Sequence, residues 1–415
     1  MRRVILCLTL LSLILAACDA GGTATPPSIE SITQAAPTLR QAQDEATTDQ
    51  AAIVPTPQPT PQATSSPSPT PSAPTSLPIE APTVAASTLP GLPQGELKIA
   101  GLQAIQLIGD PQSGDSFYAL TPTGLYITRD GGLTWAQVTP APQQDDFVFS
   151  LAEPGLLYAG AGADCYRGGP DQPFYKSVNG GATWSELPNG VNLRPVAVHP
   201  ADPNQIWAIG CAGPAYSPDG GETWTVPSND LFMLYDVTHV VPTLDWSVIY
   251  VGGASEGGSG LVANSQDGGA SWRALLQESP EQPFWWINDL LVAPPSVPGD
   301  PQRLFLADPH SVWRSRDGGD TWEALNEGLQ DVVYRDGADF ATIGLNALAV
   351  DDSTVPATVY LGTAQGVYQS VDEGETWSRL TGGPWESAPV HDLALGTAPR
   401  RLLITSDEGV FVFEP

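Results

Sequence analysis

An eight-residue pattern that recurs six times constrains this chain more than any other feature. Each copy approximates Ser/Thr-x-Asp-x-Gly-x-Thr-Trp, and successive copies lie 40 to 55 residues apart. A period of this size is typical of propeller blades, in which each repeat forms one small antiparallel sheet. The third and eighth positions of the copies are Asp130, Asn179, Asp219, Asp267, Asp317 and Asp372, and Trp135, Trp184, Trp224, Trp272, Trp322 and Trp377.

The chemistry of the pattern favours a structural turn over a binding site. An Asp carboxylate can accept hydrogen bonds from the backbone of a tight turn, the Gly can adopt positive φ, and the Trp can bury a large surface. The motif resembles the Asp box, or BNR repeat, of sialidases, sortilin-type receptors, xyloglucanase-type hydrolases and the photosystem II assembly-factor family. That resemblance implies a structural repeat away from the binding face. Asn179, Ser271 and Glu373 depart from the pattern, yet we expect all six turns to form.

Strand patterns around the repeats predict an all-β, seven-bladed propeller of four-stranded antiparallel blades over residues 96–415. In the sixth unit we expect strands at Leu345–Val350, Thr358–Gly362, Gly366–Ser370 and Thr376–Leu380. A seventh unit has only three strands, Val390–Leu395, Arg401–Thr405 and Gly409–Phe413. The spare strand Glu96–Ala100 can pair with Gly409–Phe413 and close the ring, which removes the open sheet edges.

The segment before the propeller has the features of an export signal and a tether. Residues 1–17 carry two arginines and then an apolar run, which is typical of a signal peptide. Leu15 to Cys18 resembles the lipobox of bacterial lipoproteins, which implies lipidation of Cys18, anchoring to a bacterial membrane and an extracytoplasmic head. Residues 18–95 are rich in Pro, Thr and Ser, and residues 19–95 lack Phe, Trp and Tyr, so we expect a disordered linker.

Charge excludes one class of partner. The chain has 46 acidic and 16 basic residues, a formal net charge of −30. Because nucleic-acid affinity comes mainly from Lys and Arg, we expect no nucleic-acid partner. We expect a monomeric head with no cofactor, although scattered carboxylates could bind Ca²⁺ weakly.

Candidate ligand-binding residues fall in loops that share the face opposite the repeated turns. They combine aromatic rings with amides and charges, the mixture used both for sugars and for protein interfaces. The candidates are Tyr166, Arg167, Arg194, Tyr235, Asp236, Trp285, Trp286, Asn288, Tyr334, Arg335, Asn346, Trp385 and His391.

Several candidates have a competing structural interpretation. Trp285 and Trp286 are adjacent, so in an extended chain they point to opposite sides and at least one belongs to the core. Arg194, Asn288, Asn346 and His391 begin inner strands and would ring the central channel, where they either bind a ligand or only hold water.

The two cysteines of the head are also ambiguous. Cys165 and Cys211 follow second strands of neighbouring blades, so a disulfide between them and a pair of buried thiols both fit the sequence.

Three functions remain open. The first is a non-catalytic recognition head for an extracellular glycan or protein. The second is a glycoside hydrolase that uses two loop carboxylates on a neutral glycan; a sialidase is disfavoured because no Arg-Ile-Pro sequence is present and the head is acidic. The third, implied by resemblance to the photosystem II assembly-factor family, is a protein chaperone. No catalytic residue can be assigned.

Overall fold

In the described residues the computed structural model contains strands, turns and a short 3₁₀ helix, and its compact propeller lies within residues 76–415. It describes residues 83–84, 99–100, 104, 106–110, 113–121, 124–138, 148–153, 155–162, 170–199, 201–226, 236–243, 245–255, 258–277, 284–295, 299–333, 344–396 and 400–414. The predicted signal peptide, the lipidation site Cys18 and almost all of the predicted linker lie outside these residues.

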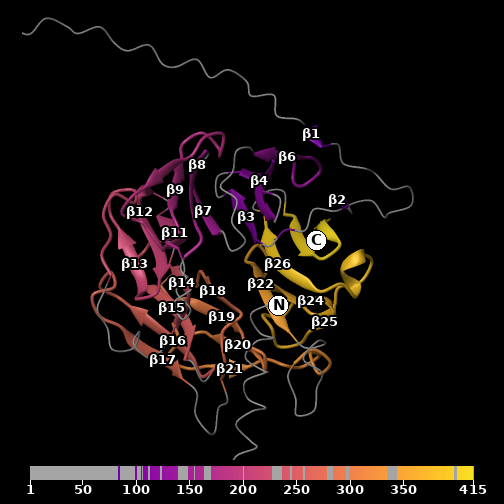
Figure 1. Cartoon of the computed structure of the whole chain (residues 1–415). Coiled ribbons are helices and arrows are strands. Elements are labelled where there is room, and N and C mark those ends of the chain that lie inside the picture. Colours follow the sequence, from indigo (N-terminus) through magenta and orange to yellow (C-terminus); the bar gives the residue numbers. More distant parts are fainter. Residues whose placement is uncertain are drawn as a thin grey trace, which may run out of the picture. The chain divides into compact units, whose positions relative to one another are not determined.

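Seven antiparallel sheets form the blades of a propeller (Figure 1). Blade 1 contains β3 (Gln106–Asp110), β4 (Ser113–Thr121), β5 (Gly124–Thr128) and β6 (Trp135–Val138). Blade 2 contains β7 (Val148–Glu153), β8 (Leu156–Gly160), β9 (Phe174–Ser177) and β10 (Ser185–Leu187). Blade 3 contains β11 (Arg194–His199), β12 (Asp202–Gly210) and β13 (Gly213–Ser217). Blades 4 and 5 contain β14 (Asp236–Pro242), β15 (Ile249–Ala254), β16 (Gly260–Ser265) and β17 (Arg273–Gln277); and β18 (Asp289–Ala293), β19 (Arg303–Ala307), β20 (Val312–Ser315) and β21 (Glu323–Ala324). Blade 6 contains β22 (Leu345–Asp351), β23 (Thr358–Thr363), β24 (Gly366–Ser370) and β25 (Ser378–Arg379). Blade 7 contains β26 (Val390–Leu395), β27 (Leu402–Ser406), β28 (Gly409–Phe413) and β2 (Ile99–Ala100). The 3₁₀ helix η2 (Pro384–Glu386) lies between blades 6 and 7.

The predicted ring closure is confirmed. Strand β2 pairs with β28, with Ile99 opposite Val410 and Ala100 opposite Gly409, so blade 7 takes one strand from the start of the propeller and three from its end. The inner strands contact one another in chain order, and β26 returns to β3. The seven blades therefore surround a central channel.

Two blades differ from the expected four-strand pattern. In blade 3 the outer strand is reduced to a single bridge between Tyr216 and Thr225. Blade 1 gains a fifth strand, β1 (Thr83–Val84), which pairs with β6. This dipeptide belongs to the range predicted as a linker, and its backbone is joined to the first sheet.

The apolar core is divided among the blade junctions. Each of seven buried clusters takes residues from two neighbouring blades. Tyr158 and Phe174 of blade 2, for example, pack with Ile206 and Ala208 of blade 3. Because apolar burial drives folding, neighbouring blades stabilise one another.

The repeated motif forms the predicted turn in all six copies. Asp267 accepts hydrogen bonds from the backbone N–H and the hydroxyl of Ser271, at 2.8 and 2.6 Å. These bonds, with the Ser265 hydroxyl, lower the pKa of Asp267 to about 2. The two copies that contain Asn179 and Glu373 keep the same backbone hydrogen bond. The backbone N–H of Thr183 donates to Asn179 Oδ1, and that of Thr376 donates to Asp372 Oδ1. Glu373 itself adopts φ 59°, where five copies have Gly.

Candidate functional site

The propeller has two faces, defined by the direction of its strands. The repeated turns join third to fourth strands and lie on what we call the box face. Loops that join second to third strands, and loops that join blades, lie on the opposite face, the loop face. Inner strands begin at the loop face and end at the box face. Most of the predicted binding residues belong to the loop face.

Two adjacent indoles lie side by side on the loop face between blades 4 and 5. The ring centroids of Trp285 and Trp286 are 5.3 Å apart, at an interplanar angle of 38°. Both side chains are partly exposed, whereas their neighbours Phe284 and Ile287 are buried. The expectation that the two rings point to opposite sides is wrong, because residues 284–287 do not form a strand. The pair forms a small aromatic surface.

A buried carboxylate holds this aromatic pair in place. Asp308 is 0% exposed, and its Oδ2 accepts a hydrogen bond from the backbone N–H of Trp285 at 3.1 Å. Its Oδ1 accepts from the backbone N–H groups of His310 and Ser311. The imidazole of His310 meets Trp285 edge to face, with centroids 4.3 Å apart. Asp308 thus holds the backbone at Trp285, and His310 packs against the Trp285 ring.

A glycine leaves room beside the second indole. Gly258, in the loop between β15 and β16, has φ 87°, and a Cβ there would lie 3.7 Å from the Trp286 ring. A Cβ at this distance would make ordinary van der Waals contact with the ring, and the positive φ is what favours glycine here. The aromatic surface therefore borders blade 4 as well as blade 5.

Three residues predicted to ring the channel form links between blades. Asn288 Nδ2 donates to the Leu345 carbonyl of blade 6 at 2.7 Å. Asn346 Nδ2 donates to the Val390 carbonyl of blade 7, also at 2.7 Å. A guanidinium nitrogen of Arg194 donates to a blade 4 carbonyl, that of Thr238, at 3.1 Å. These contacts hold inner strands together, a role that the sequence analysis did not anticipate.

Two carboxyl groups at the same end of the channel make similar links. Asp289 accepts from the backbone N–H of Leu348 in blade 6, and Asp392 accepts from that of Leu107 in blade 1, both at 2.7 Å. Burial raises the pKa of Asp289 to about 6. Burial, opposed by backbone hydrogen bonds and reinforced by the charge of Asp289, raises the pKa of Asp392 to about 7. Both side chains retain partial access to the channel.

Two histidines lie near these carboxyl groups in the fold. Burial and the neighbouring Arg194 charge lower the pKa of His239 to about 4. The predicted site residue His391 contacts Asp407 of its own blade, with Nε2 and Oδ1 2.7 Å apart. His391 is thus part of the loop-face rim of the channel.

The remaining candidates are distributed differently from the prediction. Trp385 is wrong as a ligand-binding residue, because it is 1% exposed and packs against Phe411 and Phe413 in the core between blades 6 and 7. Asp236 begins β14, and only its backbone is described. Tyr166, Arg167, Tyr235, Tyr334 and Arg335 lie outside the described residues.

Cysteine chemistry is partly settled. Cys211 is disulfide-bonded, whereas Cys165 lies outside the described residues, so the pairing of these two remains a prediction.

Metal-binding clusters and membrane-spanning helices are absent from the described ranges. No group of three or more His, Cys, Asp or Glu side chains there is placed to hold a metal ion. In the same ranges, no helix has the length and apolarity needed to cross a membrane.

The sequence analysis missed Asp289, Asp392, His310 and Asp308. One signal was available for the first two, because Asn288-Asp289 and His391-Asp392 occupy matching positions at the starts of β18 and β26. Nothing in the sequence indicated that His310 and Trp285 are in contact, since that contact depends on the path of two loops.

Comparison with known proteins relates this propeller to xyloglucan-degrading enzymes. A xyloglucanase from a Paenibacillus species is 29% identical over 171 residues, which is 37% of this chain and 16% of that protein. A probable oligoxyloglucan-reducing end-specific xyloglucanase from Neosartorya fischeri is 27% identical over 218 residues, 45% of this chain and 25% of that protein. The GH74 xyloglucanase from Xanthomonas campestris matches with a TM-score of 0.54 at 20% identity, over 80% of this chain and 53% of that one. No protein-family profile matches the chain.

These comparisons establish a class of fold and favour one of the open functions. The chain is a seven-bladed β-propeller, with xyloglucanases among its sequence relatives and structural neighbours. It spans only 16% and 25% of the two curated relatives, so their activities do not transfer as a whole. Of the alternatives left open by the sequence, the glycoside hydrolase receives more support from these relatives than the non-catalytic head does.

Proposed function

We propose that this protein engages a neutral polysaccharide of the xyloglucan type at the loop face of its propeller. The observation that carries the proposal is the Trp285–Trp286 pair, which is partly exposed and fixed by Asp308. Indole faces stack on the C–H faces of sugar rings. A net charge of −30 favours a neutral glycan over an anionic one. The xyloglucanase relatives supply the glycan class.

Hydrolysis is the form of this function that the relatives favour. A glycoside hydrolase needs two carboxyl groups, one of them protonated at the working pH. Asp289 and Asp392 are at the loop-face end of the channel, and the pKa of each is raised, to about 6 and about 7. Asp392 would then serve as the acid and Asp289 as the second carboxylate. A non-catalytic head would use the same aromatic surface without that pair.

Binding and hydrolysis are tested with the same protein. Titration calorimetry with xyloglucan oligosaccharides is expected to show binding that Trp286→Ala weakens about tenfold, which corresponds to about 1.4 kcal/mol. Trp246→Ala is the matched control, because Trp246 lies in the turn between β14 and β15 on the box face. Equal losses in both variants, or no binding to the unsubstituted protein, would contradict the proposal.

Chromatography of the reaction mixture then separates the two forms. Released sugars that disappear in both Asp289→Asn and Asp392→Asn, with binding retained, would support the hydrolase. Binding without release would support a recognition head.

We also propose that the protein is an exported lipoprotein, on the resemblance of Leu15 to Cys18 to a lipobox. Mass spectrometry of the mature N-terminal peptide tests this directly. A diacylglyceryl group on Cys18, lost together with membrane association in Cys18→Ala, is the expected result. An unmodified cysteine would refute it.

A further inference from the structure

A cavity lies towards the box-face ends of three inner strands, away from the Trp285–Trp286 pair on the loop face. It has a volume of about 270 Å³ and is formed by the ends of β18, β22 and β26 at the box face. Its lining residues are Leu291, Val292, Ala293, Pro294, Leu348, Ala349, Val350, Asp352, Leu393 and Leu395. The space equals about nine water molecules at their liquid volume of about 30 Å³ each. It is large enough for a small organic molecule.

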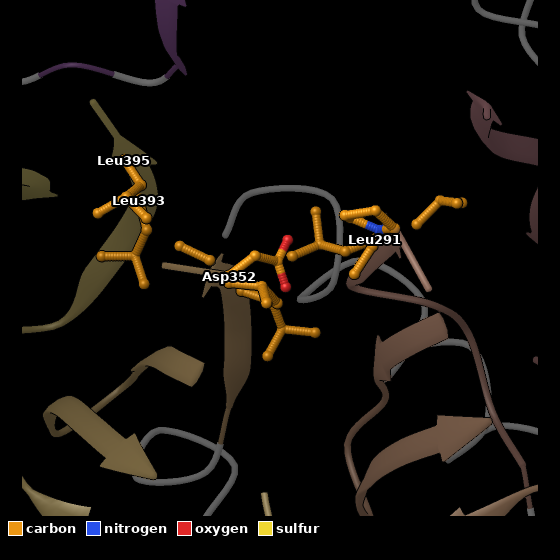
Figure 2. Close-up of a pocket in the computed structure, with 10 residues that line it drawn as sticks. Leu291, Asp352, Leu393 and Leu395 are labelled. Atoms are coloured by element: carbon orange, nitrogen blue, oxygen red, sulfur yellow. The ribbon is translucent and has the colours of Figure 1, made fainter. Parts of the chain in front are cut away.

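The lining combines apolar side chains with one carboxylate. Leu291, Val292, Val350 and Leu395 are each partly exposed, although apolar residues of inner strands are otherwise mostly buried. Asp352 is the one charged residue among the ten that line the cavity. In Figure 2 its carboxylate lies between Leu291 of β18 and the leucines of β26. An apolar ligand there would meet a hydrogen-bond acceptor.

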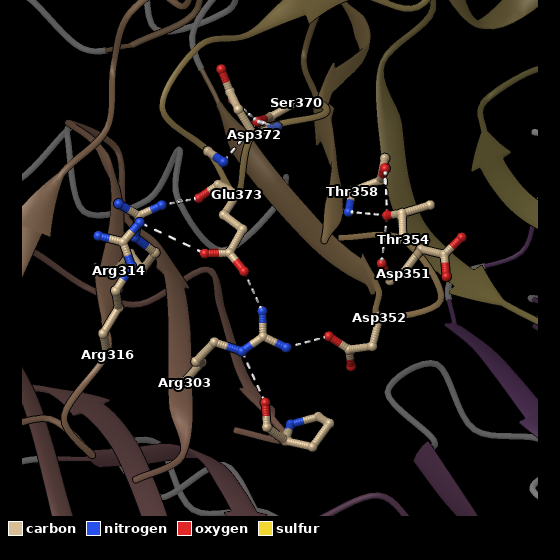
Figure 3. A network of polar contacts seen from close by, with 12 residues as sticks. Arg303, Arg314, Arg316, Asp351, Asp352, Thr354, Thr358, Ser370, Asp372 and Glu373 are labelled. Carbon is tan, nitrogen blue, oxygen red and sulfur yellow. Dashed lines mark hydrogen bonds and ion pairs between the residues drawn. The ribbon is translucent and has the colours of Figure 1, made fainter. Parts of the chain in front are cut away.

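The carboxylate is held in place by a buried arginine. Arg303 contacts Asp352 through one guanidinium nitrogen, Glu373 through another at 2.7 Å, and the Pro294 carbonyl through Nε at 2.9 Å (Figure 3). The Arg303 side chain is 7% exposed, whereas that of Asp352 is 32% exposed. The buried Arg303 thus orients the Asp352 carboxylate from the protein interior, and that carboxylate remains accessible from the cavity.

The charges around this carboxylate favour a cation. The ion-pair network that includes Arg303 extends to Arg314 and Arg316, and Arg400 contacts Asp351 at 3.3 Å beside it. Five carboxylates, those of Asp351, Asp352, Glu323, Glu373 and Glu375, therefore share four guanidiniums. The network has one carboxylate more than it has guanidiniums, and Asp352 is the member that lines the apolar cavity, where a positive group is attracted.

We propose that this cavity binds small primary amines whose apolar body has about five or six carbons. The ammonium group donates to Asp352, and the alkyl body lies against the leucines and valines of the three inner strands. The chain net charge of −30 adds a favourable long-range attraction. This site is distinct from the Trp285–Trp286 pair, which precedes β18 on the loop face, whereas the cavity is lined by later residues of the inner strands.

The test uses hexan-1-amine as probe and hexan-1-ol as its uncharged control, each added to the intact protein. Saturation-transfer NMR and calorimetry are expected to show a saturable site with millimolar affinity, at least about fivefold tighter for the amine. Asp352→Asn should abolish the preference for the amine. Asp320→Asn, which removes a 56% exposed carboxylate from the repeated turn of blade 5, should leave it unchanged.

A second variant guards against loss of the fold. Leu395→Phe narrows the cavity and keeps Asp352, so it should weaken both probes while the near-ultraviolet circular dichroism stays that of the unsubstituted protein. Equal affinity for amine and alcohol, amine binding that survives Asp352→Asn, or the absence of saturation with the amine would each overturn the proposal.

Discussion

The contribution of Asp392 to the stability of this propeller should fall as the pH rises from about 4 to about 7, whereas His239, whose pKa is lowered to about 4, acts in the opposite direction over part of this range. The pKa of Asp392 is raised to about 7 in the folded protein, from a reference value of 3.8. Between these values the folded state binds more protons than the unfolded state, so each increase in pH favours unfolding. Below pH 3.8 the Asp392 carboxyl is protonated in both the folded and the unfolded state, so it adds no cost. Above pH 7 it is ionised in both states, and the full free-energy cost of burying its charge is present.

The magnitude follows from the change in proton affinity. At about 1.4 kcal/mol for each tenfold change, the cost for Asp392 is about 4.5 kcal/mol, and partial exposure of the side chain reduces it to about 2–3 kcal/mol. Asp289, with a pKa of about 6, adds a smaller contribution in the same direction. The bonds that both carboxylates accept from neighbouring blades limit the cost without removing it.

Asp392→Asn isolates this effect. The amide stays neutral but can accept only one of the two backbone hydrogen bonds, from Leu107 or Leu393, which costs about 1 kcal/mol. The variant should therefore be about as stable as the unsubstituted protein at pH 5, where part of the ionisation cost of Asp392 is already present, and more stable at pH 8, by about 1–2 kcal/mol. Asp320→Asn should leave the pH dependence unchanged, because that carboxylate is exposed.

Urea unfolding followed by tryptophan fluorescence at pH 5 and pH 8 measures these differences. The reasoning is refuted if Asp392→Asn shows the same pH dependence as the unsubstituted protein.

Three further substitutions test other parts of the structure. Arg303→Ala should lower the free energy of unfolding by about 3 kcal/mol, because it leaves Asp352 and Glu373 without their buried cation; an unchanged melting temperature would argue against this. Trp385→Ala should lower the free energy of unfolding, measured with denaturant, by about 3–5 kcal/mol and leave glycan affinity unchanged. A loss of glycan affinity without a loss of stability would show that Trp385 belongs to the binding site. Cys211→Ser should lower the free energy of unfolding by about 2–4 kcal/mol without reductant, and the stability of the variant should not respond to dithiothreitol. Equal stability of the variant and the unsubstituted protein without reductant would disprove this.

The repeat predicted the fold because each blade is a local unit. The turn, its neighbouring strands and the closing strand at 99–100 all follow from short-range patterns, and the structure has them at the predicted places. The departures occur where local pattern is weak. The outer strand of blade 3 shrinks to one bridge, and β1 adds to blade 1 from a segment without aromatic residues.

The site was less predictable because it depends on contacts between blades. The sequence places Asn288 and Asn346 at the starts of inner strands but does not show that their amides reach carbonyls of the next blade. It equally does not show that Trp385, in the loop that contains η2, turns into the core. Each of these outcomes is set by packing between segments about 25 to 60 residues apart, which no periodicity records.

The shared blade 7 has a consequence for the order in which this protein can be completed during synthesis. Strand β2 pairs with β28, so the last junction cannot form until Gly409–Phe413 have been synthesised. Six blades can assemble in sequence, but a product that stops before Gly409 would leave Ile99 and Ala100 without their backbone partners. Ring closure thereby makes the mature architecture conditional on the synthesis of β28.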